Sequence, residues 1–173
     1  MPLETKIVSI RQANQEDLPF VEQMSYEACF PDWLDERPTI EEARQIDWFQ
    51  AYTRDWLNQR DDFGLIAEDE QGVPLGAAWY RDYPVPESDG GIPSHELVMA
   101  LLPQARGKKI GKKLLTGLID SASKNGISEL SLIVRENNEI AKALYDKIGF
   151  TAIKKTDEGY ITMVAPTSAE RIK

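Results

Sequence analysis

One basic, glycine-bearing segment, Gln104–Gly111, has the clearest chemical signature in the sequence. Five cations fall in or just after it within eight positions, with no acidic residue among them: Arg106, Lys108, Lys109, Lys112 and Lys113. Gly107 and Gly111 allow a ligand to approach the main chain closely. We expect the segment to open a helix, whose first N–H groups lack partners and carry a partial positive charge. These features together predict a phosphate-binding site.

The spacing of this segment excludes two common phosphate motifs. A nucleoside triphosphate loop has four residues between its glycines, followed by Lys-Ser or Lys-Thr. Here Gly107 and Gly111 are three residues apart, and Lys112 is followed by another lysine. A dinucleotide motif usually follows the first strand of a repeated β-α-β unit, not the middle of a chain. The alternative to a phosphate site is a plain helix start with a solvated lysine face.

The charge of the remaining chain limits the class of partner. The net charge is −9, and outside this basic segment the chain carries 15 basic and 29 acidic residues. Such an acidic body repels nucleic acids and membrane surfaces, so we expect neither as a partner. A small basic segment on an acidic protein is better suited to binding a small polyanionic ligand. The acidic surroundings also favour a cationic acceptor, although negative charge serves solubility as well.

Length and cysteine content predict the overall class of protein. With 173 residues and 42% hydrophobic content, we expect one domain, residues 1–173. One cysteine, Cys29, and one histidine, His95, provide no metal-cluster spacing, so we expect no metal. The absence of a signal-like apolar run and the unpaired cysteine predict a cytoplasmic protein. Monomer and homodimer both remain open.

The first half of the chain contains turn and capping signals that divide it into elements. Asn14 is a typical N-cap for a first helix that ends at Pro31, with an apolar face made by Leu18, Val21, Met24 and Ala28. Thr39 begins a capping box, which predicts a second helix reaching about Gln59. Alternation and turn residues predict strands at Ile7–Ile10, Phe63–Glu68 and Val73–Arg81.

The second half predicts a strand–helix–strand crossover followed by another helix and a hairpin. The expected strands are Glu96–Leu102, Leu130–Val134, Phe150–Lys155 and Tyr160–Val164. The expected helices run from about Lys108 to Lys124, and from Asn137 or Asn138 to Gly149. Tyr83–Pro93 reads as a long loop. The order β, α, α, β, β, β, α, β, α, β, β predicts an α/β (α+β) fold. Its sheet is mixed and mostly antiparallel, with about seven strands and helices on both faces.

Two of these segments resemble one family. Val98–Gly111 is similar to motif A of the GNAT acetyltransferase superfamily, which reads Gln or Arg, two residues, Gly, one residue, Gly or Ala. Arg106 and Gly111 match its ends, whereas Lys109 stands where the family usually has glycine. Asn138–Phe150 matches the family's Asn-x-x-Ala-x-x-Leu-Tyr-x-x-x-Gly-Phe segment at every named position. Two motifs in the right order are more specific than either alone.

The resemblance implies an N-acetyltransferase that uses acetyl-coenzyme A (acetyl-CoA) as acyl donor and an amine as acceptor. Main-chain groups near Ala100, Leu101 and Leu102 would pair with the pantetheine arm like an added strand. Asn138 would contact the same arm, and Tyr145 would lie near its sulfur. The pyrophosphate would be held by Arg106, Gly107, Lys108, Lys109, Ile110, Gly111 and Lys112.

Acyl transfer from a thioester needs an acid and a base. A phenol with a pKa of about 10 can protonate a thiolate whose thiol has a pKa of about 8.5, so Tyr145 is the candidate acid. Its alternative role is packing alone. At pH 7, deprotonating the acceptor costs roughly 4.6 kcal/mol for a lysine-like amine and about 1 kcal/mol for an α-amine. Glu96, at a position where some family members place a catalytic glutamate, is the favoured base. His95 is the alternative, on the opposite face of the strand.

The acceptor pocket is expected between the first two helices, Trp33, Trp48, Tyr52 and the loop Tyr83–Pro93. A second hypothesis is a catalytically weak or inactive GNAT-fold module that binds acyl-CoA and regulates a partner. A third, nucleic-acid binding through the lysines, is disfavoured by the acidic body.

Overall fold

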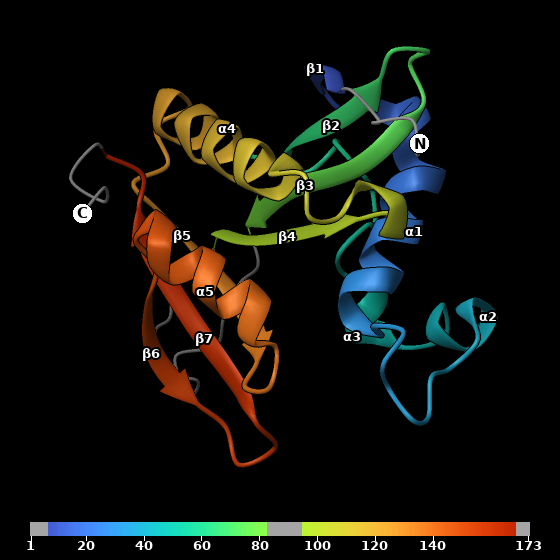
Figure 1. The fold of residues 1–173 in the computed structure, drawn as a ribbon, viewed down its shortest axis with the longest axis vertical. Helices are drawn as coiled ribbons and strands as arrows, with labels where there is room; N and C mark the ends of the chain where they lie inside the picture. The colour runs from blue at the N-terminus through green and yellow to red at the C-terminus, as the bar shows by residue number, and fades with distance from the viewer. Residues whose placement is uncertain (1–6, 83–94, 169–173) are drawn as a thin grey trace.

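A computed structural model describes residues 7–82 and 95–168. Its seven strands form one sheet in the order β1-β2-β3-β4-β5-β7-β6 (Figure 1). The strands are β1 Ile7–Gln12, β2 Phe63–Asp69, β3 Pro74–Asp82, β4 His95–Leu101, β5 Glu129–Arg135, β6 Thr151–Lys155 and β7 Tyr160–Pro166. Neighbouring strands pair antiparallel except β4 and β5, which are parallel. The predicted mixed, mostly antiparallel sheet is confirmed.

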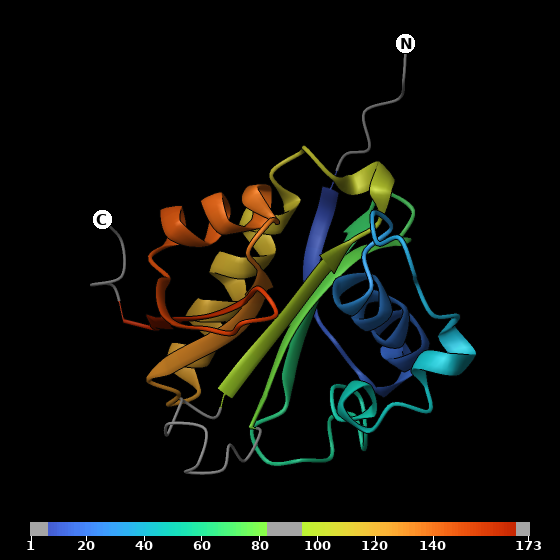
Figure 2. The ribbon, with the colours of Figure 1, turned by 90° about the horizontal axis from the view of Figure 1, so that it is seen from below.

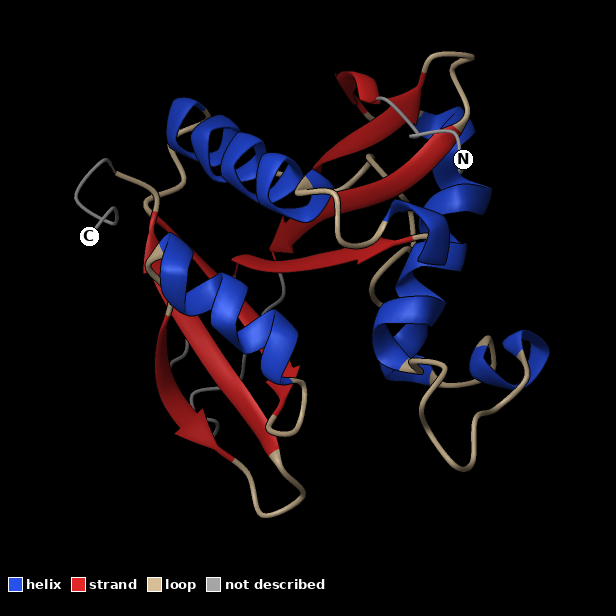
Figure 3. Cartoon of the chain, viewed as in Figure 1, coloured by secondary structure: helices blue, strands red, loops and turns tan. Residues whose placement is uncertain are grey.

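The helices cover both faces of the sheet. They are α1 Leu18–Cys29, α2 Ile40–Ala43, α3 Asp47–Gln50, α4 Ile110–Lys124 and α5 Glu139–Ile148, with short 3₁₀ turns at Gln15–Asp17 and Pro103–Ala105. Helices α4 and α5 lie on one side of β4, and α1 and α3 lie on the other (Figures 2 and 3). Among the described residues, no helix combines the length and apolar character needed to cross a membrane. The loop expected at Tyr83–Pro93 lies outside the described residues.

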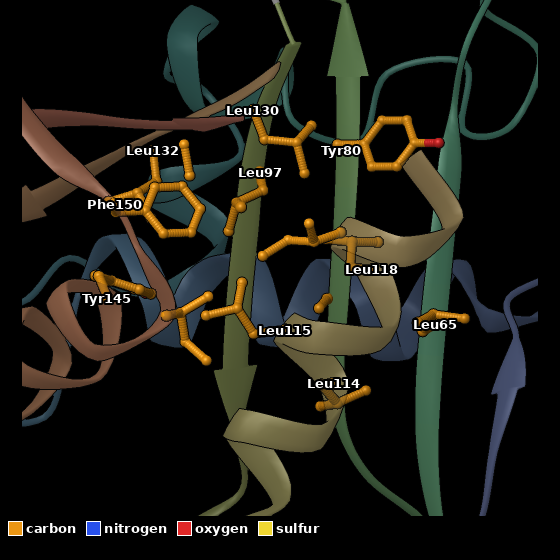
Figure 4. Packing of buried hydrophobic residues seen from close by; sticks show 14 of the residues in the cluster. Leu65, Tyr80, Leu97, Leu114, Leu115, Leu118, Leu130, Leu132, Tyr145 and Phe150 are labelled. Atoms are coloured by element: carbon orange, nitrogen blue, oxygen red, sulfur yellow. The ribbon is translucent and has the colours of Figure 1, made fainter. Parts of the chain in front are cut away.

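Two hydrophobic clusters pack against the two faces. The cluster under α4 and α5 is built around Leu114, Leu115 and Leu118, which are fully buried (Figure 4). The cluster under α1 contains Met24 and Trp79, which are also fully buried. In α1 the buried positions are Val21, Met24 and Ser25, whereas Leu18 and Ala28 are exposed. The helix is therefore rotated relative to the predicted face.

Strand β4 contributes to both clusters, as predicted for a central strand. Leu97, Met99 and Leu101 pack on the α4 side. Val98 and Ala100 pack on the α1 side. Because side chains alternate along a strand, Glu96 faces the same side as Val98.

The predicted long helix from Thr39 to about Gln59 is wrong. The capping box at Thr39 is present, but it opens only the one-turn helix α2, and α3 is equally short. Beyond Gln50 the chain forms turns. Side chains of β3 donate hydrogen bonds to main-chain carbonyls that would accept N–H groups of the next turn if the helix continued. Arg81 donates to the carbonyls of Ala51 and Arg54, and the Trp79 indole donates to that of Tyr52.

The turn segment 51–62 is anchored by a buried ion pair. Arg81 Nε donates to Asp62 Oδ1 at 2.9 Å, and the two side chains are 0% and 1% exposed. Asp55, Leu57 and Asp61 all have positive φ, which residues other than glycine adopt at a cost. The anchor therefore fixes a backbone path that local propensity does not favour, and it places Tyr52 over the sheet.

Candidate active site

The sheet opens between β4 and β5. The parallel ladder joins them at one position, Glu96 with Ser131. Beyond it β4 remains paired with β3, and β5 remains paired with β7, along their whole lengths. The two strands therefore part, and the β4 main chain facing β5 has no strand partner among the described residues. Such an edge can accept an extended chain in the manner of an added strand.

The direction of the main chain in β4 refines the residues expected to use this edge. The Leu102 N–H is bonded to the Leu75 carbonyl, on the β3 side. Since main-chain directions alternate, Ala100 also faces β3, whereas Met99 and Leu101 face the opening. Of the three residues expected to pair with a pantetheine arm, only Leu101 presents its main chain to this opening.

The basic loop connects the opening to α4. Helix α4 begins at Ile110, two residues later than predicted, because Lys109 is left-handed with φ 64°. Gly107 is left-handed as well, with φ 75°. Among the described residues no side chain caps the first turn of α4, in contrast to Asn14, Thr39 and Asn138, which cap their own helices. The free N–H groups and exposed lysines fit the predicted phosphate site.

Lys109 therefore adopts the conformation for which the family usually has glycine. A residue other than glycine in this conformation costs roughly 1–2 kcal/mol. The lysine is exposed, so its side chain remains available to an anion. The departure from the motif changes the side chain and leaves the glycine-like backbone path intact.

The two loop glycines are expected to respond differently to alanine. Gly107→Ala should lower the free energy of unfolding by roughly 1–2 kcal/mol, because alanine is strained at positive φ. A Cβ at Gly107 would meet nothing within 4 Å, so crowding would not contribute. Gly111→Ala should be tolerated, since its Cβ would make ordinary contacts, with Leu101 and Met99 at 3.6 Å. Urea denaturation of both variants tests this; equal losses would contradict it.

Arg106 forms a weak contact in this structure. Its Nη1 lies 3.7 Å from Asp32 Oδ2, and the side chains are 46% and 56% exposed. Exposed pairs of this kind contribute little, because water and salt screen them. The Arg106 guanidinium therefore remains available for a phosphate.

Asn138 and Tyr145 lie on α5, as the second motif predicts. The Asn138 side chain accepts the Ala141 N–H and caps the helix, so its oxygen has a structural partner. Tyr145 enters the cluster under α4 and α5, edge-on to Phe150 (Figure 4). Burial raises the pKa of Tyr145 to about 12. The phenol therefore keeps its proton at neutral pH, but it is a weaker acid than the ordinary pKa of about 10 implies.

Glu96 lies on the other face of the sheet, beside α1 and the segment 51–62. Burial raises the pKa of its carboxyl to about 7, and a hydrogen bond from Tyr52 opposes this rise. A carboxyl with this pKa can both accept and release a proton near neutrality. The sequence marked Tyr52 only as a pocket residue, because its contact with Glu96 depends on the anchored turns.

His95 faces away from Glu96. Its Nε2 lies 3.2 Å from Asp61 Oδ2, and its ring is edge-on to Tyr80. A candidate metal-binding group is formed by Asp61, Asp82 and His95, whose ligand atoms lie within 4.8 Å of one another. It is the one group with such spacing in the described part of the chain. This contact and the opposite orientation favour Glu96 over His95 as the base.

The Glu96 face carries the predicted residues Trp33 and Trp48 and an arginine, Arg135, that was not predicted from the sequence. Trp33 is 46% exposed, and the Arg135 guanidinium lies 5.8 Å from its ring centre. Trp48, 53% exposed, packs against Phe30 instead. Arg135 lies at the end of an apolar strand, a position that in sequence signals only the strand boundary.

Comparison with known proteins adds a family to this geometry. Residues 10–150 match the family model described as Acetyltransferase (GNAT) family. A mycothiol acetyltransferase of Saccharomonospora viridis is 31% identical over 123 residues, which cover 70% of this chain. The chain spans only 37% of that relative's length.

Two further proteins are matched over more of their own length. An L-amino acid N-acyltransferase of Escherichia coli (strain K12) is 28% identical over 118 residues, which cover 68% of this chain and 63% of that protein. The structure of yncA from Salmonella typhimurium, solved with its cofactor acetyl-CoA, aligns with a TM-score of 0.64 and 23% identity. That alignment covers 92% of this chain and 94% of the other.

Proposed function

Since this chain belongs to the GNAT family of acetyltransferases, we propose that it transfers an acetyl group from acetyl-CoA to an α-amine. Glu96 acts as the base and Tyr145 as the acid. We also propose that residues 1–173 work as one domain, because strands from Ile7 to Pro166 share one sheet. The Salmonella protein of the same fold holds acetyl-CoA, which supports the choice of donor.

The placement of Glu96 and Tyr145 on opposite faces of the sheet supports this proposal. Glu96 is the last β4 residue paired with β5, and it faces the α1 side. The next residue, Leu97, faces the other side and shares a cluster with Tyr145. Base and acid thus lie on opposite faces of the sheet. This suits an amine that enters from one face while a thiol leaves toward the other.

The donor fits the chain at two places. The β4 edge at Met99 and Leu101 would hold the pantetheine arm, and the uncapped start of α4 with Arg106 and the lysines would hold the pyrophosphate. When bound there, acetyl-CoA supplies a thioester that an amine can attack. The chain's own contribution is to hold the two substrates together, which accounts for a large part of the acceleration in such reactions.

The pKa of Glu96 favours an α-amine over a lysine-like amine as acceptor. A carboxyl with a pKa of about 7 lies close to an α-amine near 7.8 and far from an alkyl amine near 10.4. Proton transfer to Glu96, directly or through water, is therefore nearly balanced for the α-amine. The similarity to an L-amino acid N-acyltransferase points to the same class.

The pH dependence of the reaction should report Glu96. The base works only when deprotonated, so kcat/KM should rise with pH through about 7. In Tyr52→Phe the hydrogen bond that lowers the Glu96 pKa is absent, so this rise should move to higher pH. Using one amine for both proteins keeps the acceptor's own ionisation constant. An unchanged profile would exclude Tyr52 as a modulator and weaken the assignment of Glu96.

Tyr145→Phe should lower kcat by about 10²-fold or more, the effect typical of removing a positioned acid. Its hydroxyl has no hydrogen-bond partner among the described residues, so its loss should leave the fold intact. Thiol release from acetyl-CoA measures the rate, and calorimetry with acetyl-CoA confirms that the variant still binds. A variant that turns over at the wild-type rate would leave Tyr145 with a packing role only.

The same pair of measurements separates an enzyme from a regulatory module. The enzyme binds acetyl-CoA in calorimetry and releases thiol faster when an α-amine is present. A module binds acetyl-CoA without any amine-dependent thiol release. Failure to bind acetyl-CoA would exclude both.

A further inference from the structure

Arg135 is a guanidinium whose charge is not matched by an acid. It ends β5, and the neighbouring Val134 packs in the α4–α5 cluster, so Arg135 points to the opposite face, the face of Glu96. It lies 4.9 Å from the Tyr160 ring centre and contacts Trp33 as described above. Its Nη2 donates a long hydrogen bond, 3.4 Å, to the Cys29 carbonyl. No carboxylate in the described part of the chain pairs with it.

A second arginine at the same helix end, Arg37, differs from Arg135 in having a carboxylate beside it. Arg37 also lies over an aromatic ring, 4.4 Å from the centre of Tyr26, and donates to the Phe30 carbonyl at 2.6 Å. Its Nη2 additionally lies 2.8 Å from the Glu27 carboxylate. Both arginines complement the C-terminus of α1, but only Arg37 has a carboxylate partner. The contact with the end of α1 uses one Arg135 nitrogen, so other guanidinium N–H groups remain available to a ligand.

The strand register locates Arg135 relative to Glu96. Glu96 of β4 pairs with Ser131 of β5, and Ser131 and Arg135 lie four residues apart on the same face of β5. The hydrogen bond from Arg135 to the Cys29 carbonyl holds the guanidinium against the end of α1. Arg135 also borders a hollow of about 280 Å³ with Glu136, Asn137, Glu158 and Gly159. A small solute can therefore reach its side chain.

We propose that Arg135 binds the α-carboxylate of the acceptor, which makes the substrate a free α-amino acid rather than a peptide N-terminus. This rests on the proposed acetyl transfer to an α-amine. Amino acids carry an ammonium and a carboxylate on one carbon, and this face presents a carboxyl and an unmatched guanidinium. The planar fork of arginine suits a carboxylate, and the two aromatic rings hold its plane in place.

The test compares amino acids with their own primary amides. Several L-amino acids with different side chains are each paired with the matching amide, and kcat/KM is measured by thiol release from acetyl-CoA. The wild type should prefer the acid by about tenfold or more, the value of a charged hydrogen bond. A free carboxylate raises the pKa of the neighbouring amine above that of the amide, so the preference for the acid cannot come from intrinsic reactivity. Pairing of that carboxylate with Arg135 would offset the rise and bring the amine back toward the pKa that suits Glu96.

Arg135→Gln should raise KM for the acids by about 10- to 100-fold while kcat/KM for the amides stays within about threefold. Arg135→Lys, which keeps the charge, should recover part of the preference. The matched control Arg37→Gln should leave the acid-to-amide ratio unchanged, since Arg37 is already paired.

Several outcomes would overturn the proposal. Wild-type protein that acetylates amides or short peptides as well as acids has no carboxylate subsite, although the acetyl transfer itself stands. An equal loss for acids and amides in a folded Arg135→Gln protein assigns Arg135 a structural role only. If that variant does not fold, the wild-type ratio alone decides. No thiol release with any α-amine would instead refute the proposed function.

Discussion

Glu96→Gln is expected to lower kcat/KM by about 10²- to 10⁴-fold, the range typical of losing a positioned general base. Glutamine keeps the size of the side chain and can still accept the hydrogen bond from Tyr52, but it cannot take a proton from the amine. The residual rate should also lose its dependence on a group titrating near pH 7. Thiol release with acetyl-CoA and an α-amine measures both effects. A variant within about threefold of wild type would exclude Glu96 as the base.

The same substitution should stabilise the protein at high pH. Glu96 binds its proton more tightly in the folded protein, where its pKa is about 7, than in the unfolded chain, where the value is near 4.5. Ionisation of this carboxyl therefore lowers the free energy of unfolding. The loss builds up as pH rises from about 4.5 to 7 and is complete above pH 7. The difference between Glu96→Gln and wild type should grow by up to about 3 kcal/mol over this range.

Denaturation at pH 4.5 and pH 8 checks this expectation, because the two proteins share every other titrating group. Stabilisation together with loss of activity is the signature of a charge that is held in the site at a cost to the fold. Equal stability of the two proteins at both pH values would indicate that Glu96 is better solvated than its pKa implies.

Arg81→Met is expected to lower the free energy of unfolding by about 3–5 kcal/mol, since it leaves the Asp62 charge buried without its partner. The carbonyls of Ala51 and Arg54 lose their donors as well. Because these turns position Tyr52 against Glu96, the folded fraction should show the same shift of the pH profile as Tyr52→Phe. Urea denaturation gives the stability, and thiol release against pH gives the shift.

Two controls isolate the buried pair. Arg81→Met combined with Asp62→Leu should recover part of the stability, because no buried charge remains unpaired. Arg44→Met removes an exposed pair with Glu22 and should change stability far less. A loss for Arg81→Met no larger than for Arg44→Met would contradict the anchoring role of this ion pair.

The sequence predicted the sheet well because its signals are local. Apolar runs and alternation between clear turn residues placed every described strand to within about two residues of its observed ends. Helices α4 and α5 were predicted for the same reason, since an amphipathic stripe and a terminal Asn-Gly or Gly define them. The positions of Glu96 and Tyr145 on their strand and helix therefore followed from pattern and from the two motifs.

The predictions of helix boundaries failed where residues distant in sequence determine the backbone conformation. The capping box at Thr39 is a correct local signal, yet Arg81 and Trp79 take the carbonyls that would have extended the helix to Gln59. The start of α4 shifted because Lys109 adopts a glycine-like conformation, which its residue type does not suggest. The contact of Tyr52 with Glu96 and the unmatched charge of Arg135 likewise depend on tertiary packing.

We propose that this chain transfers the acetyl group of acetyl-CoA to an α-amine, with Glu96 as the base and CoA as the released thiol. The most direct test of this claim is the rate of free-thiol release at saturating acetyl-CoA, with a panel that sets α-amines against side-chain amines. We predict that α-amines accelerate thiol release well above the amine-free rate, and that lysine-like amines do so far less. Acetyl-CoA binding without acceleration by any α-amine would contradict the claim.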